Sequence, residues 1–472
     1  MIRKKELLYM GIANHIEEQI KHEVLKVGDR LPSLRTICIE RGVSLTTAQQ
    51  SYFELESRGL IESRPQSGYY VSYAHKYFRN APSPSQPIIA KPGEDVGDII
   101  SAIAQNSAKV KIMLSSGVAS PELLPVAKLN KAIINATREL PESGIDYDRQ
   151  GNSKLRKQIA LRSLLWGGKL KADDIVPTSG CMDALSFCMM ALAQKGDTIA
   201  VESPVYFGIL QLARLQGLNV LELPTHPATG IDPDALKKAL EKKKVKLCLL
   251  VSNFSNPLGS CMPDEHKKEV VRLMEKHHVP LIEDDLFGDL YYGKQRPLNC
   301  KTFDESGIVL WCGSFSKTLA PGYRVGWVAP GQFREKIERT KMYHSLYCTS
   351  ITHEAIGSFL ENGRYENHLR RLRMVLHRNS LQMQRCISEY FPADTRVTRP
   401  QGAMQLWVEL NRKTDTVELY NRAMKQGISV APGRMYTLQD QYNNCLKLNY
   451  GMLWNDKVEE ALKTVGGLAG KL

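Results

Sequence analysis

The chain has 472 residues, 43% hydrophobic and 24% charged, which predicts a globular protein of two or three domains with a large core. Ten cysteines with no C-x-x-C pair and no His/Cys ligand spacing argue against a secreted disulfide framework and a structural metal site. The net charge of +13 indicates an anionic partner, yet residues 1–80 hold 12 Lys and Arg against 9 Asp and Glu, so +10 lies elsewhere. No run reaches membrane-spanning length and no signal peptide precedes the first helix, so we expect a soluble, cytoplasmic protein.

Three short helices are predicted at the N-terminus. Leucines and isoleucines at helical spacing indicate a first helix over residues 7–22. A second helix over residues 34–41 and a third over residues 45–58 each follow a serine cap, and Gly42 separates them. Two short helices across a tight glycine turn are typical of a helix-turn-helix.

Two apolar strands follow, over residues 60–64 and 69–72, on either side of a Pro/Gly turn. They indicate a hairpin, which with the three helices forms a winged helix-turn-helix over residues 1–78. On pattern alone, a three-helix regulatory or dimerisation module that binds no nucleic acid stays open.

Sequence detail in this region resembles the GntR family of bacterial regulators. The resemblance rests on four segments, 31–35, 43–48, 55–61 and 68–71. It implies that the third helix enters the major groove of double-stranded DNA and that a glycine at the wing tip passes near the minor groove. The positions that match the family's DNA-binding residues are Arg35, Ser44, Thr46, Thr47, Gln49 and Gly68.

One position departs from the GntR pattern. Leu45 stands where the family often has an arginine, so an arginine–guanine contact is missing. The neighbouring hydroxyls suit phosphate positioning, and Gln49 is suited to read an adenine. Base specificity therefore stays open.

The next stretch, residues 79–97, is rich in proline and serine and poor in apolar residues. It predicts a semi-extended linker that packs in neither domain core. In residues 98–472, apolar β-type segments alternate with amphipathic helices, which predicts an α/β fold with a largely parallel sheet. From about residue 365 we expect a smaller C-terminal α+β subdomain.

A lysine is central to this second region. Lys317 follows the apolar strand 308–312 in a turn-rich segment; taken alone, such a lysine is most often an ordinary solvated side chain. The residues that accompany Lys317 in the sequence resemble, in their order and spacing, those of the fold-type I aminotransferases, which hold pyridoxal 5'-phosphate as a Schiff base on a lysine. The residues that match in order are Gly180, Tyr206, Asn256, Asp284, Lys317 and Arg324.

The phosphate of the cofactor needs hydrogen-bond donors and positive charge. A helix that begins after a glycine offers free backbone N–H groups, two serines add hydroxyls, and an arginine adds a bidentate fork. The residues assigned to the phosphate are Gly180, Cys181, Met182, Ser314, Ser316 and Arg324.

The ring and the aldehyde need other partners. The resemblance implies that Tyr206 stacks on the ring, Asn256 donates to the phenolic oxygen and Asp284 keeps the ring nitrogen protonated. Lys317 then forms the aldimine as the catalytic residue. Taken one at a time, the tyrosine, the asparagine and the aspartate also have ordinary readings in packing, turns and helix caps.

A winged helix, a linker and a fold-type I domain together resemble the MocR subfamily of GntR regulators over nearly the whole chain. The resemblance implies a transcription factor that binds pyridoxal 5'-phosphate and an amine or amino-acid effector, and that forms a head-to-tail homodimer. Tyr147 lies in a Tyr-x-x-x-Gly-x-x-x-Leu-Arg pattern that the family places by the subunit interface. A tyrosine that packs within its own loop is an equal alternative.

Three departures bear on catalysis. Leu286 and Phe287 stand where the family usually has a tyrosine on the cofactor oxygen, and Lys447 replaces the arginine that grips a substrate α-carboxylate. The segment Gly180-Cys181-Met182 lacks the usual hydroxyl and amide. These departures predict a cofactor pocket with a weakened grip on amino acids and favour a regulator; an active aminotransferase with a DNA-binding appendage and a scaffold without cofactor stay open.

Overall fold

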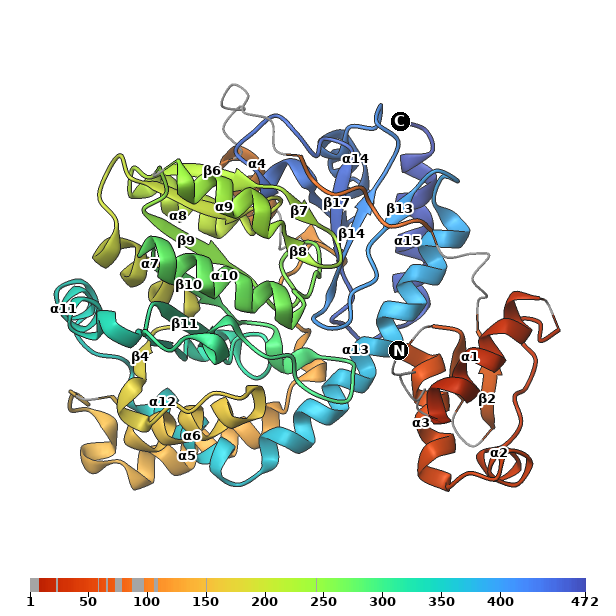
Figure 1. Cartoon of the computed structure of the whole chain (residues 1–472), viewed down its shortest axis with the longest axis horizontal. Helices are drawn as coiled ribbons and strands as arrows, with labels where there is room; N and C mark the ends of the chain where they lie inside the picture. The colour runs from red at the N-terminus through yellow and green to blue at the C-terminus, as the bar shows by residue number, and fades with distance from the viewer. Residues whose placement is uncertain are drawn as a thin grey trace, which may run out of the picture.

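Figure 1 shows the computed structural model of the protein, in which a small N-terminal domain lies beside a larger body. The structure describes residues 8–22, 24–57, 59–64, 67–72, 79–86, 97–105, 109–149, 151–242 and 244–472. Within these ranges, we find no helix with the length and apolar content needed to span a bilayer.

The N-terminal domain is a winged helix-turn-helix, as predicted. Its elements are α1 (Leu8–Lys21), α2 (Leu34–Arg41), α3 (Leu45–Ser57), β1 (Ile61–Arg64) and β2 (Gly68–Val71). Ser33 caps α2 by accepting from the Thr36 N–H at 3.1 Å, and Gly42 ends it with φ of 59°. A core of its own, including Ile16 and Leu55, holds the domain together. The predicted residues 1–7, 23, 58, 65–66 and 73–78 lie outside the described ranges.

The larger body is built on a seven-stranded sheet in the order β4-β12-β11-β10-β9-β5-β6. β12 runs antiparallel to both neighbours and the other pairs are parallel, which confirms the predicted sheet. Its strands are β4 (Val176–Thr178), β5 (Thr198–Glu202), β6 (Asn219–Leu223), β9 (Leu247–Leu250), β10 (Leu281–Asp284), β11 (Val309–Ser314) and β12 (Gly326–Ala329).

Helices cover both faces of this sheet. Ile199 and Val201 of β5 face one cluster with α7, α8 and α11, whereas Ala200 between them faces α9 and α10. The five helices are α7 (Cys181–Leu192), α8 (Phe207–Leu215), α9 (Pro233–Glu241), α10 (Asp264–His277) and α11 (Arg334–Ser345). A further layer beside β4 is formed by α5 (Val126–Glu139), α6 (Ser153–Ser163) and α12 (Ser350–Glu361) (Figure 1).

A smaller antiparallel sheet, β13-β14-β17-β16, forms the C-terminal subdomain with three helices. These elements are α13 (Arg364–Tyr390), β13 (Arg396–Val397), β14 (Gln405–Glu409), α14 (Thr416–Met424), β16 (Ala431–Pro432), β17 (Cys445–Asn449) and α15 (Asp456–Ala469). The remaining elements are α4 (Gly97–Gln105), β3 (Ile112–Met113), which pairs with β15 (Ile428–Ser429), and the pair β7 (Thr225–His226) and β8 (Gly230–Ile231).

The expectation that residues 79–97 pack in neither core is wrong for the described part, 79–86. The Arg79 guanidinium donates to a carbonyl in the last turns of α13 at 2.9 Å. Ser85 is buried and exchanges two hydrogen bonds with Thr225, at 2.9 and 2.7 Å. Polar groups of this segment therefore find partners on the larger body. The rest of this stretch lies outside the described ranges.

Candidate functional site

The candidate site lies where the central strands of the large sheet end. Parallel strands open their carboxyl ends on one edge, which is the usual place for a ligand in such sheets. Asp284 is the last residue of β10 and Ser314 the last of β11, and Lys317 follows in the loop after β11. The sheet thus brings together residues that are far apart in sequence.

The Lys317 amine is held in a closed setting. Its Nζ donates to the Gly117 carbonyl at 2.7 Å and lies 5.8 Å from the centre of the Phe287 ring. Burial lowers the pKa of Lys317 to about 8; the charge of Arg324 lowers it further, while Asp284 opposes the shift. An amine with a lowered pKa is available in its uncharged, nucleophilic form near neutral pH.

The Asp284 carboxylate lies close enough to that amine for the two charges to shift each other's pKa. It is 3% exposed and accepts a hydrogen bond from the Cys181 thiol at 3.6 Å. Burial raises the pKa of Asp284 to about 7, and the Lys317 charge opposes this rise. A positively charged partner at this carboxylate would hold it ionised.

A second buried acid, Glu202 at the end of β5, was missed from the sequence. Burial and the neighbouring Asp284 raise the pKa of Glu202 to about 8, so it is protonated at neutral pH. Its Oε1 accepts from the Val251 N–H at 3.3 Å, and its Oε2 has no partner among the described residues. The sequence gives no signal for Glu202, because an acidic residue at the end of a strand is common and no motif surrounds this one.

An anion cradle lies at the N-terminus of α7. Gly180 has φ of 100°, and a Cβ there would clash with the Arg324 guanidinium, so only glycine allows this close approach. No side chain caps the helix, which leaves its first N–H groups free. Nearby, the Ser316 N–H donates to Ser314 Oγ at 3.3 Å, and Ser316 Oγ has no partner within the described ranges.

Three further residues were predicted to bind the cofactor: Tyr206, Asn256 and Met182. Tyr206 precedes α8 within electrostatic reach of Asp284 and Arg324, and its pKa is raised mainly by burial. Asn256 is 9% exposed, and its Oδ1 finds no partner in the described chain. The Met182 side chain is partly buried and packs against the hydrophobic cluster that includes residues of α7 and β5.

Lys447 of β17 is a second buried lysine beside the first. It is 3% exposed, and its Nζ donates to the carbonyls of Ser115 and Ser116 at 3.0 and 2.7 Å. Burial and the nearby Lys317 charge lower the pKa of Lys447 to about 7. One segment, from Ser115 to Gly117, therefore binds both amines through consecutive carbonyls.

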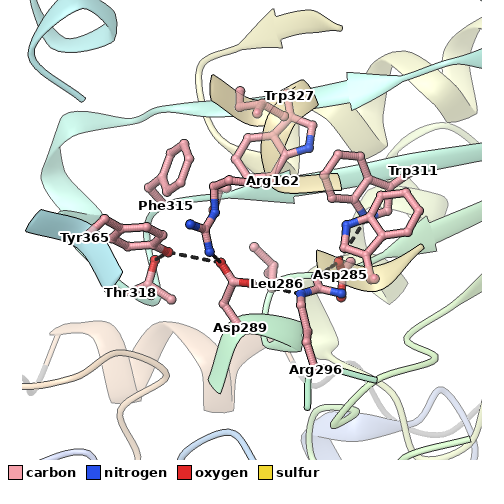
Figure 2. Close-up of a pocket in the computed structure, with 13 residues that line it drawn as sticks. Arg162, Asp285, Leu286, Asp289, Arg296, Trp311, Phe315, Thr318, Trp327 and Tyr365 are labelled. Carbon is pink, nitrogen blue, oxygen red and sulfur yellow. Dashed lines mark hydrogen bonds and ion pairs between the residues drawn. The ribbon is translucent and has the colours of Figure 1, made fainter. Parts of the chain in front are cut away.

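A buried ion-pair network lies behind the site and was not predicted (Figure 2). Asp289 accepts from Arg296 and Arg162, each at 2.8 Å, and these guanidinium groups hold its pKa well below the usual range despite burial. Asp285 accepts from Arg296 and from the Trp311 N–H at 2.9 Å. The network surrounds a cavity of about 20 Å³, enough for one water molecule.

Thr318, which follows Lys317, is held by two side chains of α13. The Tyr365 hydroxyl lies 2.7 Å from Thr318 Oγ1 and 3.2 Å from Asp289 Oδ2 (Figure 2), and His368 Nε2 lies 2.7 Å from the Thr318 carbonyl. Both side chains come from the first turns of α13. The position of the Lys317 loop is thus tied to the position of α13.

Two protein families match this chain. Residues 109–465 match the family described as aminotransferase class I and II. Residues 8–71 match the bacterial regulatory proteins of the gntR family.

Two relatives align with nearly the whole chain, and one solved structure aligns with most of it. The HTH-type transcriptional regulator YjiR of Escherichia coli strain K12 is 37% identical over 468 residues, which are 97% of this chain and 98% of YjiR. YdcR of the same strain, also described as an HTH-type transcriptional regulator, is 35% identical over 462 residues, 98% of each chain. The structure of LysN, an alpha-aminoadipate aminotransferase of Thermus thermophilus complexed with N-(5'-phosphopyridoxyl)-L-leucine, aligns with a TM-score of 0.72 at 26% identity, over 78% of this chain and 94% of LysN.

The lowered pKa of Lys317 makes a kinetic prediction. Only the uncharged amine attacks an aldehyde, so covalent attachment of pyridoxal 5'-phosphate should speed up as pH rises and level off above a midpoint near 8 instead of near the ordinary 10.5. Stopped-flow absorbance between pH 6 and 10 measures this, with Lys317→Ala as the unreactive control. A rate that keeps rising to about pH 10 would contradict the assignment.

We expect the substitution Asp284→Asn to weaken cofactor binding and, above about pH 4, to stabilise the cofactor-free protein. Asp284→Asn should weaken cofactor binding by about 3 to 5 kcal/mol, because the partner cation loses its buried anion. In the cofactor-free protein the folded state binds the Asp284 proton more tightly than the unfolded state, so stability falls as pH rises from 3.8 to about 7. The variant should lack that fall.

Titration with the cofactor and urea unfolding at several pH values measure both effects. Asp173→Asn, at a side chain that is 91% exposed, is the control for each. Equal affinity in wild type and Asp284→Asn would refute the ring-nitrogen assignment.

Proposed function

The chain belongs to the aminotransferase class I and II family and carries a gntR-type DNA-binding domain ahead of it, and from this premise we propose that it is a transcriptional regulator that responds to an amine or amino acid through pyridoxal 5'-phosphate. In this proposal residues 1–78 bind double-stranded DNA, residues 79–97 connect, and residues 98–472 hold the cofactor. The single observation that carries the proposal is a continuous set of contacts from the site lysine to the DNA-binding domain.

The site residues fit pyridoxal 5'-phosphate, the cofactor of this family. A glycine cradle with free N–H groups suits its phosphate and a buried carboxylate suits its ring nitrogen. The Ser316 hydroxyl, which has no partner among the described residues, can donate to a phosphate oxygen. When bound, the cofactor supplies an aldehyde that condenses with primary amines and a ring that withdraws electrons. The residues we assign to holding it are Gly180, Cys181, Met182, Tyr206, Asn256, Asp284, Ser314, Ser316, Lys317 and Arg324.

The exposed side chains of the winged helix support DNA reading, with an adjustment to their roles. Ser44 Oγ caps α3 by accepting from the Thr47 N–H at 3.2 Å, and the two hydroxyls share a hydrogen bond at 2.9 Å. Their hydroxyls are thus partly engaged in the cap, which leaves Arg35, Thr46 and Gln49 as the freer readers, all exposed.

The wing tip also fits a close approach to DNA. Gly68 has φ of 108°, a value that favours glycine, and it is exposed. A Cβ there would lie 3.5 Å from Arg30 Nε, so an arginine accompanies the wing tip. Arginine beside a wing suits the negative potential of a minor groove.

Contacts from the site run through α13. Tyr365 and His368 hold the backbone and side chain of Thr318, next to the site lysine. Further along the same helix, the Arg373 Nε donates to the Asp289 carbonyl at 2.7 Å, and its guanidinium lies 3.9 Å from the centre of the Tyr291 ring.

The loop that Arg373 holds reaches the DNA-binding domain. Lys294 Nζ lies 4.1 Å from the centre of the Tyr9 ring in α1. A ligand that shifts the Lys317 loop therefore has a physical route by which to bias the position of α1. The shift is limited to the difference in ligand affinity between the two positions.

Lys447 supports a regulator over an efficient aminotransferase. Two of its three N–H donors already bind backbone carbonyls, and it offers no bidentate fork to an α-carboxylate. We propose that it is the effector-facing residue and that it grips amino acids weakly. An active aminotransferase with a DNA-binding appendage is the rival, favoured by the lowered pKa of Lys317.

We also propose a head-to-tail homodimer in the cytoplasm. The large side chains of Ile145, Tyr147 and Tyr343 are 88%, 63% and 81% exposed. Exposed large apolar side chains of this kind suit a surface that a second copy of the chain covers. Tyr147 contacts Tyr347 with ring centres 5.1 Å apart, so the predicted interface tyrosine lies beside a second aromatic ring.

The regulator and the enzyme differ in turnover. We expect a series of amino acids to change the cofactor absorbance once, with no steady multiple turnover when a keto acid is added. Lys447→Arg should tighten amino-acid binding by about tenfold, because a fork replaces a point charge. Absorbance titration and coupled product assays measure this; sustained turnover in the wild type would favour the rival.

The Tyr365 hydroxyl should carry the coupling. Tyr365→Phe should keep the cofactor band and the DNA affinity without amine, and should reduce the amine-induced change in DNA affinity several-fold. Tyr390→Phe is a matched control, because that hydroxyl lies on the last turn of the same helix and binds Glu459 at 3.0 Å. Fluorescence anisotropy on a duplex selected by the protein from a random pool measures the change.

An amine response that is equal in Tyr365→Phe, Tyr390→Phe and the wild type would refute the route through α13. The cofactor band, measured on the same samples, separates loss of coupling from loss of the cofactor.

A further inference from the structure

The DNA-binding domain leaves most of the positive charge unexplained. Residues 1–80 carry a net charge of +3, whereas the whole chain carries +13. The longest helix, α13, holds six arginines against two glutamates over 27 residues. Part of the excess charge is therefore concentrated on one element.

Four of these arginines form one exposed face. Arg364, Arg371 and Arg378 recur every seven residues, which places them in a row on a helix, and Arg370 lies beside the row. All four are exposed, while Leu369, Leu372 and Leu376 on the opposite face are buried. We call Arg364, Arg370, Arg371 and Arg378 the basic stripe; it spans about 21 Å at 1.5 Å per residue.

The basic stripe has no acidic partner. None of its four guanidinium groups makes an ion pair with any residue that the structure describes, although Arg385 on the same helix pairs with Glu459 at 3.0 Å. The one acid in this half of α13, Glu366, contacts Arg162 instead. A row of unpaired arginines on a rigid helix is costly in self-repulsion and suits an anionic ligand.

Lys128 adds positive charge near the basic stripe. The neutral form of His368 is favoured mainly by burial, and the charges of Lys128 and Arg371 lower its pKa further. Lys128 is an exposed residue of α5, so a second helix adds positive charge beside the stripe. The patch therefore extends across two elements.

The helix that carries the stripe passes near the DNA-binding domain. In Figure 1, α13 passes along the side of the winged helix, between it and the large sheet. The contacts agree, because the loop that contacts Tyr9 of α1 through Lys294 is the one that Arg373 of α13 holds. DNA bound by α3 has this helix close by.

We propose that the basic stripe binds the phosphate backbone of duplex DNA that flanks the segment read by α3. This inference rests on the proposed function and extends it, because it gives the aminotransferase-like domain a direct part in DNA binding. Arginine forks match phosphate oxygens, and steps of about 10 Å along the helix match about three base pairs. A protein partner fits less well, because Met374 is the single large apolar side chain on this described face and offers no anchor cluster.

The test is the salt dependence of DNA affinity in the full-length protein loaded with cofactor. The probe is a 60-base-pair duplex of mixed sequence, since backbone contacts need no particular bases. Replacing Arg370, Arg371 and Arg378 by glutamine should make the slope of log affinity against log salt shallower by about 0.9 for each phosphate that is no longer neutralised, roughly 2 to 3 in total.

Three comparisons accompany this variant. Replacing the same arginines by lysine should preserve the slope, because a point charge also neutralises phosphate. Replacing Arg412, Lys413 and Lys425 by glutamine removes three exposed charges around α14, away from the stripe, and should leave the slope unchanged (Figure 1). The cofactor band and the urea midpoint confirm folding in each variant.

Equal slopes in the stripe variant and the wild type would overturn the inference while leaving the proposed function intact. An effect of the variant that is confined to binding of anionic phospholipid vesicles would overturn it too. The variant Thr46→Ala/Gln49→Ala should lose sequence selectivity and keep its slope. A wild type that binds no duplex at low salt would instead overturn the proposed function itself.

Discussion

The structure depends on one buried pair, the amine of Lys317 and the carboxylate of Asp284. Each is removed from water at the carboxyl edge of the sheet, and burial moves their pKa values toward each other, to about 8 and about 7. Within the described protein the amine binds one carbonyl, and the carboxylate accepts from a weak thiol donor and from the Leu286 backbone, which does not offset the cost of burial. Such a pair costs free energy unless a ligand completes it. We propose that a cofactor with an aldehyde and a ring nitrogen completes both ends.

The surroundings keep this pair in place. Asp285, directly after Asp284, is fixed by Arg296 and Trp311, so the end of β10 cannot shift without breaking a buried network. The Lys317 loop is fixed from the other side, because α13 holds Thr318. We propose that a small displacement of that loop is passed to this 27-residue helix.

Local chemistry made much of the fold predictable. Ser33, Gly42 and Ser44 set the helix ends of the winged helix through caps that need only a few neighbouring residues. Continuous apolar runs between amphipathic helices predicted the parallel sheet, because strands buried on both faces have no polar side. The cofactor residues remain a prediction from their resemblance to a known family; the structure adds that Asp284, Cys181 and Arg324 all lie close enough to Lys317 to shift its pKa.

What the sequence could not reveal depends on long-range contacts. Nothing local to Gly117 shows that its carbonyl receives the Lys317 amine 200 residues away, or that Tyr365 reaches Thr318. Glu202 has no motif and matters only because the fold buries it beside Asp284. The prolines after residue 79 said nothing of the partners that Arg79 and Ser85 find on the larger body.

In this account α13 serves both ends of the protein: its first turns hold the lysine loop, and its middle holds the loop against α1. The most direct test of the central claim is the protection pattern on a DNA fragment selected by the protein from a random pool. The pattern should be mapped with cofactor and a panel of primary amines, in wild type and Lys317→Ala. At least one amine should change the pattern in the wild type, and none should in the variant. An identical pattern under every condition would contradict that claim.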